Sequence, residues 1–157
     1  MLMMRTSKDG QDLIKSFESC RLRAYWDEAG MRWSIGWGRA RGVREGDECT
    51  QQQADDWFAE DLGDIETVLG NLGLVLTQSQ FDALVSFCYN VGFGKRGGKN
   101  GFLELGNGRP STMLRRLRAR DHAGAAAEFP KWIHTPGAEN GLLARRLAEQ
   151  ALFLKEG

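Results

Sequence analysis

A long apolar stripe at helical spacing, between Thr50 and Leu72, limits the folds that are open to this chain. Thr50 followed by Gln53 is a capping-box pattern, which marks the first turn of a helix. A helix of roughly 22 residues is about 33 Å long at 1.5 Å per residue, so it can cross a small protein and connect two lobes. The stripe consists of Ala54, Trp57, Phe58, Leu62, Ile65, Val68, Leu69 and Leu72.

The segment before the stripe changes its hydrophobic period. A helical period predicts a helix over 8–19, and a period of two over 21–37 predicts a β-hairpin with its turn at 27–30. Successive side chains of a strand point to opposite faces, so Ser34 and Gly36 lie on the face opposite to Trp33 and Ile35. We therefore expect Ser34 to face solvent or a cleft.

The segment after the stripe is helical apart from one glycine-rich stretch. Thr77 with Gln80 repeats the capping-box pattern and predicts a further helix. The segment from Gly92 to Pro110 is expected to be a flexible surface loop. Shorter helices are expected after Ser111 and Asp121, and a last helix over 139–154. The predicted apolar stripe of that last helix is Leu143, Leu147, Ala151 and Leu154.

These elements predict an α+β fold within a single domain, residues 1–157. A small N-terminal lobe, 8–48, contains the first helix and the hairpin. The long helix, 50–72, connects it to a C-terminal helical lobe, 77–155.

Charge and hydropathy exclude two classes of partner. The formal net charge is 0, which disfavours a dedicated nucleic-acid binder. No apolar run approaches the ~20 residues of a membrane span, so we expect no stable membrane insertion. The N-terminus lacks a signal-peptide pattern, so we expect synthesis in the cytoplasm. Basic residues predominate in 80–157, which fits either an anionic polymer or a plain solvated surface.

The sequence contains no complete cofactor-binding or metal-binding motif. The glycines at Gly36 and Gly38 begin like a dinucleotide loop, but Arg41 occupies the third glycine position. His122 and His134 have no third ligand beside them, so no metal site is expected. The three cysteines lack metal or redox spacing and are expected to be buried free thiols: Cys20, Cys49 and Cys88.

Two carboxylates stand at positions suited to acid–base chemistry. Glu18 lies in the last turn of the first predicted helix, where a negative charge opposes the helix dipole. Asp27 follows nine positions later at the hairpin turn, and Ser34 lies on the next strand. Two carboxylates in different environments can act as acid and base, which is the arrangement that hydrolyses glycosidic bonds. Spacing alone leaves open a solvated glutamate and a turn-forming aspartate.

Several motifs accompany this pair in a fixed order. They are 17–27, 33–38, Tyr89–Gly92, Ser111–Leu114, 125–132 and 141–146. Together they cover about 8–154 and resemble the phage-type lysozymes of glycoside hydrolase family 24. The resemblance implies a lysozyme-like fold and an endolysin: a muramidase that cuts the β-1,4 bond between N-acetylmuramic acid and N-acetylglucosamine in bacterial peptidoglycan, without a cofactor.

The resemblance also implies roles for individual residues. Glu18 would protonate the leaving oxygen, Asp27 would hold or activate a water, and Ser34 falls on the family's threonine position. Arg39 replaces the usual histidine and is expected either to bind a stem-peptide carboxylate or to be solvated. For Trp26 and Trp132, the expected role is stacking on sugar rings.

This chain departs from the family pattern at defined points. Besides the Ser34 and Arg39 replacements, six residues rather than about five separate Asp27 from Ser34. The segment Gly92–Pro110 is longer than the family's usual connection. For Arg145 and Arg146, two readings remain: one of them reaches Glu18, or both form a basic surface.

Two alternative functions keep the fold. A lytic transglycosylase needs only Glu18, and a non-catalytic glycan-binding relative needs neither carboxylate. By analogy with the family, we expect a monomer that a separate holin releases to the periplasm, where peptidoglycan is its partner.

Overall fold

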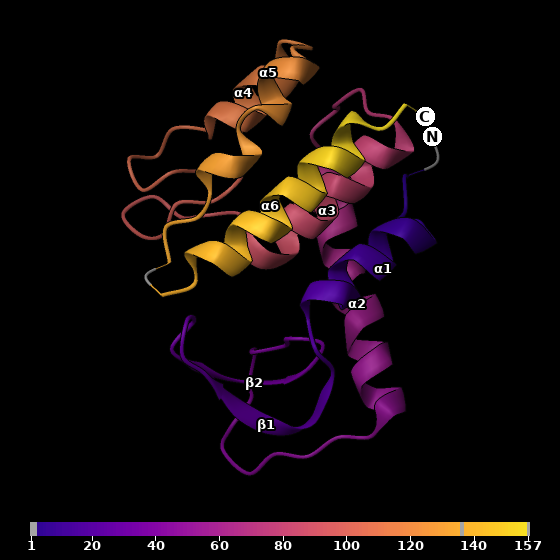
Figure 1. Cartoon of the computed structure of the whole chain (residues 1–157), viewed down its shortest axis with the longest axis vertical. Helices are drawn as coiled ribbons and strands as arrows, with labels where there is room; N and C mark the ends of the chain where they lie inside the picture. Colours follow the sequence, from indigo (N-terminus) through magenta and orange to yellow (C-terminus); the bar gives the residue numbers. More distant parts are fainter. Residues whose placement is uncertain (1–2, 136, 157) are drawn as a thin grey trace.

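The long helix connects a hairpin to a cluster of helices (Figure 1). The computed structural model describes residues 3–135 and 137–156. Helix α2, Gln51–Gly70, begins directly after Thr50, and both capping-box hydrogen bonds with Gln53 are present, as predicted. Strands β1, Arg21–Asp27, and β2, Arg32–Gly36, form a two-stranded antiparallel sheet at one end of α2. The predicted α+β class is confirmed.

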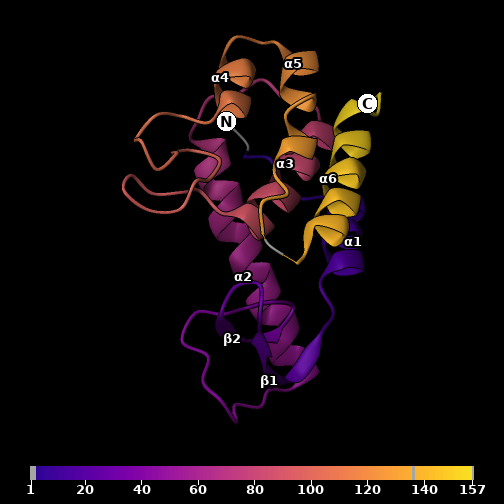
Figure 2. The same ribbon diagram turned by 60° about the vertical axis from the view of Figure 1, so that its left-hand side comes forward.

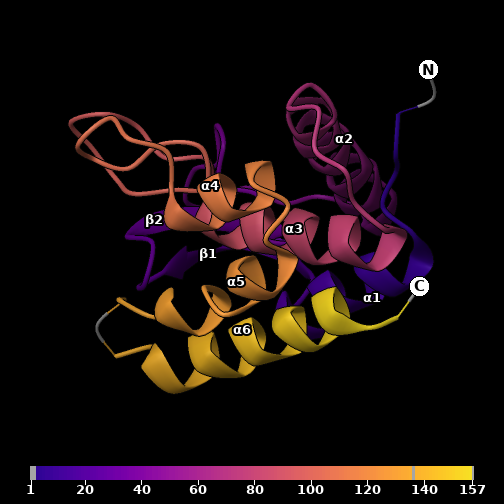
Figure 3. The same cartoon turned by 90° about the horizontal axis from the view of Figure 1, so that it is seen from above.

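Helix α3, Gln78–Val91, is the central element of the helical part (Figures 2 and 3). It packs against α1, α2 and α6. Its predicted capping box between Thr77 and Gln80 is present. The remaining helices are α1, Lys8–Phe17; α4, Thr112–Arg118; α5, His122–Ala126; and α6, Glu139–Leu154, with a 3-10 turn at Phe129–Lys131.

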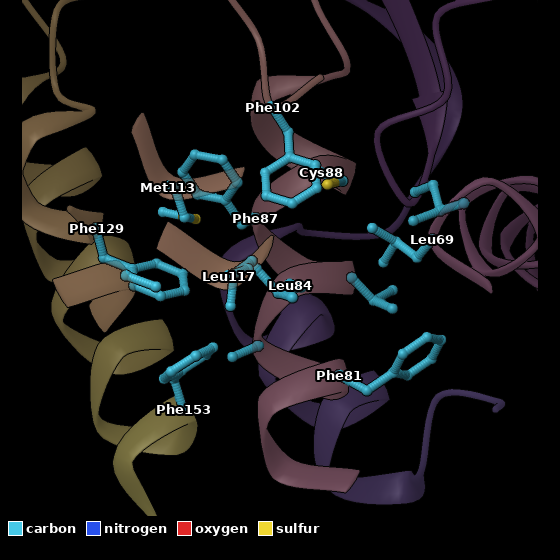
Figure 4. Packing of buried hydrophobic residues seen from close by; sticks show 14 of the residues in the cluster. Leu69, Phe81, Leu84, Phe87, Cys88, Phe102, Met113, Leu117, Phe129 and Phe153 are labelled. Atoms are coloured by element: carbon cyan, nitrogen blue, oxygen red, sulfur yellow. The ribbon is translucent and has the colours of Figure 1, made fainter. Parts of the chain in front are cut away.

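The core is built around the aromatic ring of Phe87 on α3 (Figure 4). This ring is fully buried and meets three other aromatic rings edge-on. The centroid distances are 6.3 Å to Phe102, 5.5 Å to Phe129 and 5.4 Å to Trp132. The core thereby joins α3 to the loop before α4 and to the segment before α6.

The buried face of α6 differs from the predicted stripe. Leu147 and Leu154 are 46% and 58% exposed, whereas Arg145, Arg146 and Glu149 are almost fully buried. The prediction was wrong because it counted apolar residues only. Two consecutive arginines pair with one glutamate on the next turn, and this makes a charged face compatible with burial.

The glycine-rich segment is a structured loop. Phe102 is fully buried in the core, so the prediction of a surface loop holds for the exposed tip, 95–100, and for Asn107 and Arg109, but not for the whole segment. Backbone hydrogen bonds join Leu103 N to Phe93 O at 3.0 Å and Gly97 N to Gly106 O at 2.7 Å. The two arms meet where a Cβ on Gly94 would overlap the backbone of Gly101.

All three cysteines are free, but only Cys88 is buried, so the prediction of burial was wrong for Cys20 and Cys49.

Over residues 3–135 and 137–156, the structure has no helix with the length and apolar character needed to cross a bilayer.

We predict that Phe87→Ala lowers the free energy of unfolding by about 3–5 kcal/mol, because it leaves a cavity among three rings. The exposed change Val75→Ala serves as the control and should stay within about 0.5 kcal/mol of wild type. Urea unfolding measures both. A loss below about 1 kcal/mol for Phe87→Ala would contradict the central role of this ring.

Candidate active site

Glu18 ends α1 with its side chain turned toward α6. The backbone leaves helical geometry at this residue, with φ −101° and ψ 112°, and its N–H donates to Ile14 O at 2.9 Å. The side chain is 21% exposed. The end of the helix therefore presents a carboxylate that is partly sheltered and still reachable from solvent.

A buried guanidinium fixes the orientation of this carboxylate. Arg145 Nη1 lies 3.2 Å from Glu18 Oε2, and Arg145 Nε lies 3.2 Å from Glu149 Oε2. Arg145 Nη2 donates to Ser86 O at 3.1 Å, which ties the side chain to α3. Of the two alternatives for Arg145 and Arg146, the reading with one arginine on Glu18 is confirmed, and the arginine is Arg145.

The Glu18 carboxylate also lies next to the backbone at Gly38 and near the Tyr89 phenol. A Cβ on Gly38 would lie 3.0 Å from Glu18 Oε1, and Gly38 has a φ of +90°, so this position suits glycine. Tyr89 is held by its hydroxyl, which donates to Trp37 O. Burial and the negative charges of Glu18 and Asp61 raise the pKa of Tyr89, so it remains a neutral wall.

The hairpin also contributes a phenol, Tyr25, that is affected by the charges of both predicted carboxylates. Burial, followed by the negative charges of Glu18 and Asp27, raises the pKa of Tyr25, so its phenol lies in the field of both. Tyr25 pairs with Ser34 in the antiparallel register. Sequence analysis did not single out Tyr25. The alternation along β1 was the available signal, because it places Tyr25 on the same face as Asp27.

Ser34 lies on the predicted face of the hairpin but is not open to solvent. It is only 2% exposed. The expectation of an accessible hydroxyl fails because Tyr25 is directly across the register. The hydroxyl therefore supports the neighbouring phenol from within the lobe.

A cleft of about 340 Å³ separates the hairpin turn from the helical part. Asp27 lines it on the hairpin side and Trp132 on the opposite side. The full lining consists of Asp27, Ala29, Gly30, Arg32, Asn90, Val91, Lys99, Asn100, Trp132, His134, Thr135, Ala138, Leu142 and Arg146.

Four of the predicted residues do not line this cleft: Glu18, Ser34, Trp26 and Arg39. Trp26 is 45% exposed and packs edge-on against Trp33 at 5.7 Å, on the face of the hairpin opposite to Asp27. Arg39 Nη2 lies 3.4 Å from Glu60 Oε1, and Arg39 Nη1 lies 3.7 Å from Asp61 Oδ1. The Arg39 guanidinium is thus engaged by carboxylates of α2, and its role toward substrate stays a prediction.

Comparison with known proteins shows that the chain is similar to members of one family along most of its length. The phage lysozyme family model matches residues 15–149. The chain is 37% identical to the endolysin of Acyrthosiphon pisum secondary endosymbiont phage 1, over 96% of this chain and 98% of that protein. Some other phage endolysins that it matches are longer, and the chain spans about half of their length, 55% and 54% in two Bacillus phage proteins.

Solved structures give the same result. The muramidase domain of SpmX from Asticaccaulis excentricus superposes with a TM-score of 0.77 at 35% identity, covering 97% of this chain and 99% of that one. A mutant of P22 lysozyme superposes with a TM-score of 0.73 at 33% identity, covering 98% of this chain and 100% of that one. The fold is therefore lysozyme-like, as predicted.

We predict that Gly38→Ala slows the clearing of a bacterial cell-wall suspension, because the added methyl group displaces the Glu18 carboxylate. Gly46→Ala is a matched control: its φ is +87°, and a Cβ there has nothing within 4 Å. Both variants should lose about 1–2 kcal/mol of stability from the left-handed backbone. Equal rates for the two folded variants would show that Gly38 does not position Glu18.

Proposed function

The chain belongs to the phage lysozyme family of lytic glycosidases, and from this premise we propose that it is a muramidase. The bond cut is the β-1,4 linkage between N-acetylmuramic acid and N-acetylglucosamine in peptidoglycan. The observation that carries the proposal is the Glu18–Arg145 contact at the end of α1. The negative charges of Glu18 and Asp27 both contribute to the raised pKa of Tyr25 on the hairpin.

Glu18 is the general acid in this proposal. Arg145 engages Oε2, so Oε1 is the oxygen that carries the proton to the glycosidic oxygen as the bond breaks. A proton donor must be held in one orientation over many turnovers. The contacts of Arg145 with Glu149 and Ser86 supply that rigidity.

Asp27 takes the part of the base. It lines the cleft from the hairpin side, where a water can reach the opposite face of the sugar. Asp27 accepts a proton from this water as the water attacks the anomeric carbon, and such a direct attack would invert that carbon, as the family resemblance implies. Ser34 supports the hairpin face that carries Asp27, and Trp132 offers a ring for stacking against a sugar in the cleft.

The remaining parts of the proposal concern where the enzyme acts. The protein is made in the cytoplasm of an infected host, and a separate holin releases it to the periplasm. It then degrades the cell wall as a monomer, without a cofactor. Arg39 and Trp26 do not line the cleft, and neither has an assigned contact with substrate in this proposal.

Glu18→Gln should lower turnover by roughly 100- to 10,000-fold while leaving the fold intact, because the amide cannot donate the proton. Mass spectrometry of muropeptides released from purified Gram-negative sacculi measures this directly. Wild type should release products with a free reducing muramic acid. Anhydro products from wild type would instead identify a lytic transglycosylase, and binding without release would identify a glycan-binding relative.

Asp27→Asn should slow hydrolysis strongly, and Ser34→Ala should slow it by about fivefold, the equivalent of one lost hydrogen bond of about 1 kcal/mol. Initial rates on the same sacculi give both values, with circular dichroism as the folding control. An unchanged rate for Asp27→Asn would remove the base from the mechanism and favour the transglycosylase reaction.

A further inference from the structure

Two cations line the cleft from opposite sides. Arg32 belongs to β2, and Lys99 belongs to the tip of the 92–110 loop, which projects on the same side of the molecule as the hairpin (Figures 1 and 3). In the part of the chain that the structure describes, neither side chain forms an ion pair. Loss of surrounding water and the positive charge of Arg32 both lower the pKa of Lys99. The two charges therefore repel each other across the cleft.

A third cation belongs to the same lining. Arg146 is fully buried, with Nε 2.8 Å from Glu149 Oε1 and Nη2 donating to Asn90 Oδ1 at 2.7 Å. Its Nη1 has no hydrogen-bond partner among residues 3–135 and 137–156. Because the guanidinium is a planar fork, the edge that meets Glu149 leaves Nη1 on the opposite side. Arg146 therefore lines the cleft as a buried side chain whose charge is paired with Glu149.

The acid content of the lining does not balance these charges. Of the lining residues, only Asp27 carries a carboxylate, and it stands on the hairpin side. Because Arg146 is paired with Glu149, the uncompensated lining charges are Arg32 and Lys99 against Asp27, which leaves the cleft with a net positive charge. A bound anion would relieve the repulsion and accept charge-assisted hydrogen bonds, which are stronger than neutral ones.

Lys99 is held in place by its loop. Lys95 N donates to Lys99 O at 2.9 Å, and Asn100 Oδ1 accepts from Gly106 N at 2.7 Å. The buried ring of Phe102 anchors the arm that follows. The ammonium is therefore presented to the cleft by a fixed backbone, and less freedom is lost when a ligand binds.

We propose that Lys99 and Arg32 form a subsite for carboxylates of the peptide stems of peptidoglycan. The inference rests on the proposed muramidase function, since it assigns the loop of this chain to the recognition of the stem-bearing substrate. Neutral sugars give these cations no counter-charge, whereas stem peptides carry free carboxylates next to the glycan that occupies the cleft.

The test compares native sacculi with sacculi whose carboxylates have been converted to methylamides with carbodiimide and excess methylamine. Wild type should prefer the native form. Lys99→Gln should lower the ratio of kcat/KM on native to kcat/KM on amidated sacculi by about threefold, the size expected of a partly exposed ion pair. Arg32→Gln should act in the same direction, and Lys99→Arg should restore the wild-type ratio.

Lys95→Gln is the matched control, because Lys95 is exposed in the same loop and does not line the cleft. It should keep the wild-type ratio. Equal ratios for Lys95→Gln and Lys99→Gln, or no preference of wild type for native sacculi, would overturn the subsite.

A binding measurement separates this inference from the proposed function. The Glu18→Gln protein and the Glu18→Gln/Lys99→Gln double variant are each titrated calorimetrically with a soluble disaccharide-tripeptide and with its methylamide. Tighter binding of the free acid that depends on Lys99 supports the subsite, even where wild type hydrolyses neither kind of sacculus and the muramidase proposal fails. Binding that ignores both the carboxylate and Lys99 rejects the subsite, whatever the hydrolysis shows.

Discussion

The buried carboxylate of Glu149 holds the helical part and the candidate site together. Burial raises its pKa, and the guanidinium groups of Arg145 and Arg146 oppose that shift. Ser86 Oγ donates to Glu149 Oε2 at 2.6 Å, so α3 and α6 share one polar centre inside an apolar core. Removing one member of such a network leaves an uncompensated charge, at a cost of about 3–5 kcal/mol. Since Arg145 also holds Glu18, the stability of this centre and the orientation of the proposed acid are coupled.

Local signals in the sequence predicted much of the fold. The capping boxes at Thr50 and Thr77 located two helix starts because a cap involves only neighbouring residues. The face of α6 could not be predicted in this way. Arginine and glutamate side chains are normally solvated, and Arg146 and Glu149 suit the interior because they pair within α6 and bond to Asn90 and Ser86 of α3. The anchoring of Phe102 likewise depends on a contact between distant segments.

The residues of the candidate site were predicted from family motifs and not from local helix or strand signals. Glu18 and Asp27 were selected by motifs that extend along most of the chain, since their spacing alone is compatible with ordinary surface residues. Tyr25 was missed because a tyrosine in a strand is usually a packing residue, and its pairing with Ser34 requires the register of the hairpin. Trp26 shows the converse case: its type suggested a sugar platform, and the pleat placed it on the opposite face.

The close crossing of Gly94 and Gly101 restricts how the 92–110 loop can change over evolutionary time. Nearly every single substitution at these two glycines inserts atoms where backbone already lies, so the base of the loop cannot drift one residue at a time. The segment is more readily gained or lost as a whole, as a cassette between α3 and α4. Its exposed tip, 95–100, is free of this restriction. A combinatorial library that varies the tip and keeps both glycines would therefore diversify the rim of the cleft on an unchanged frame.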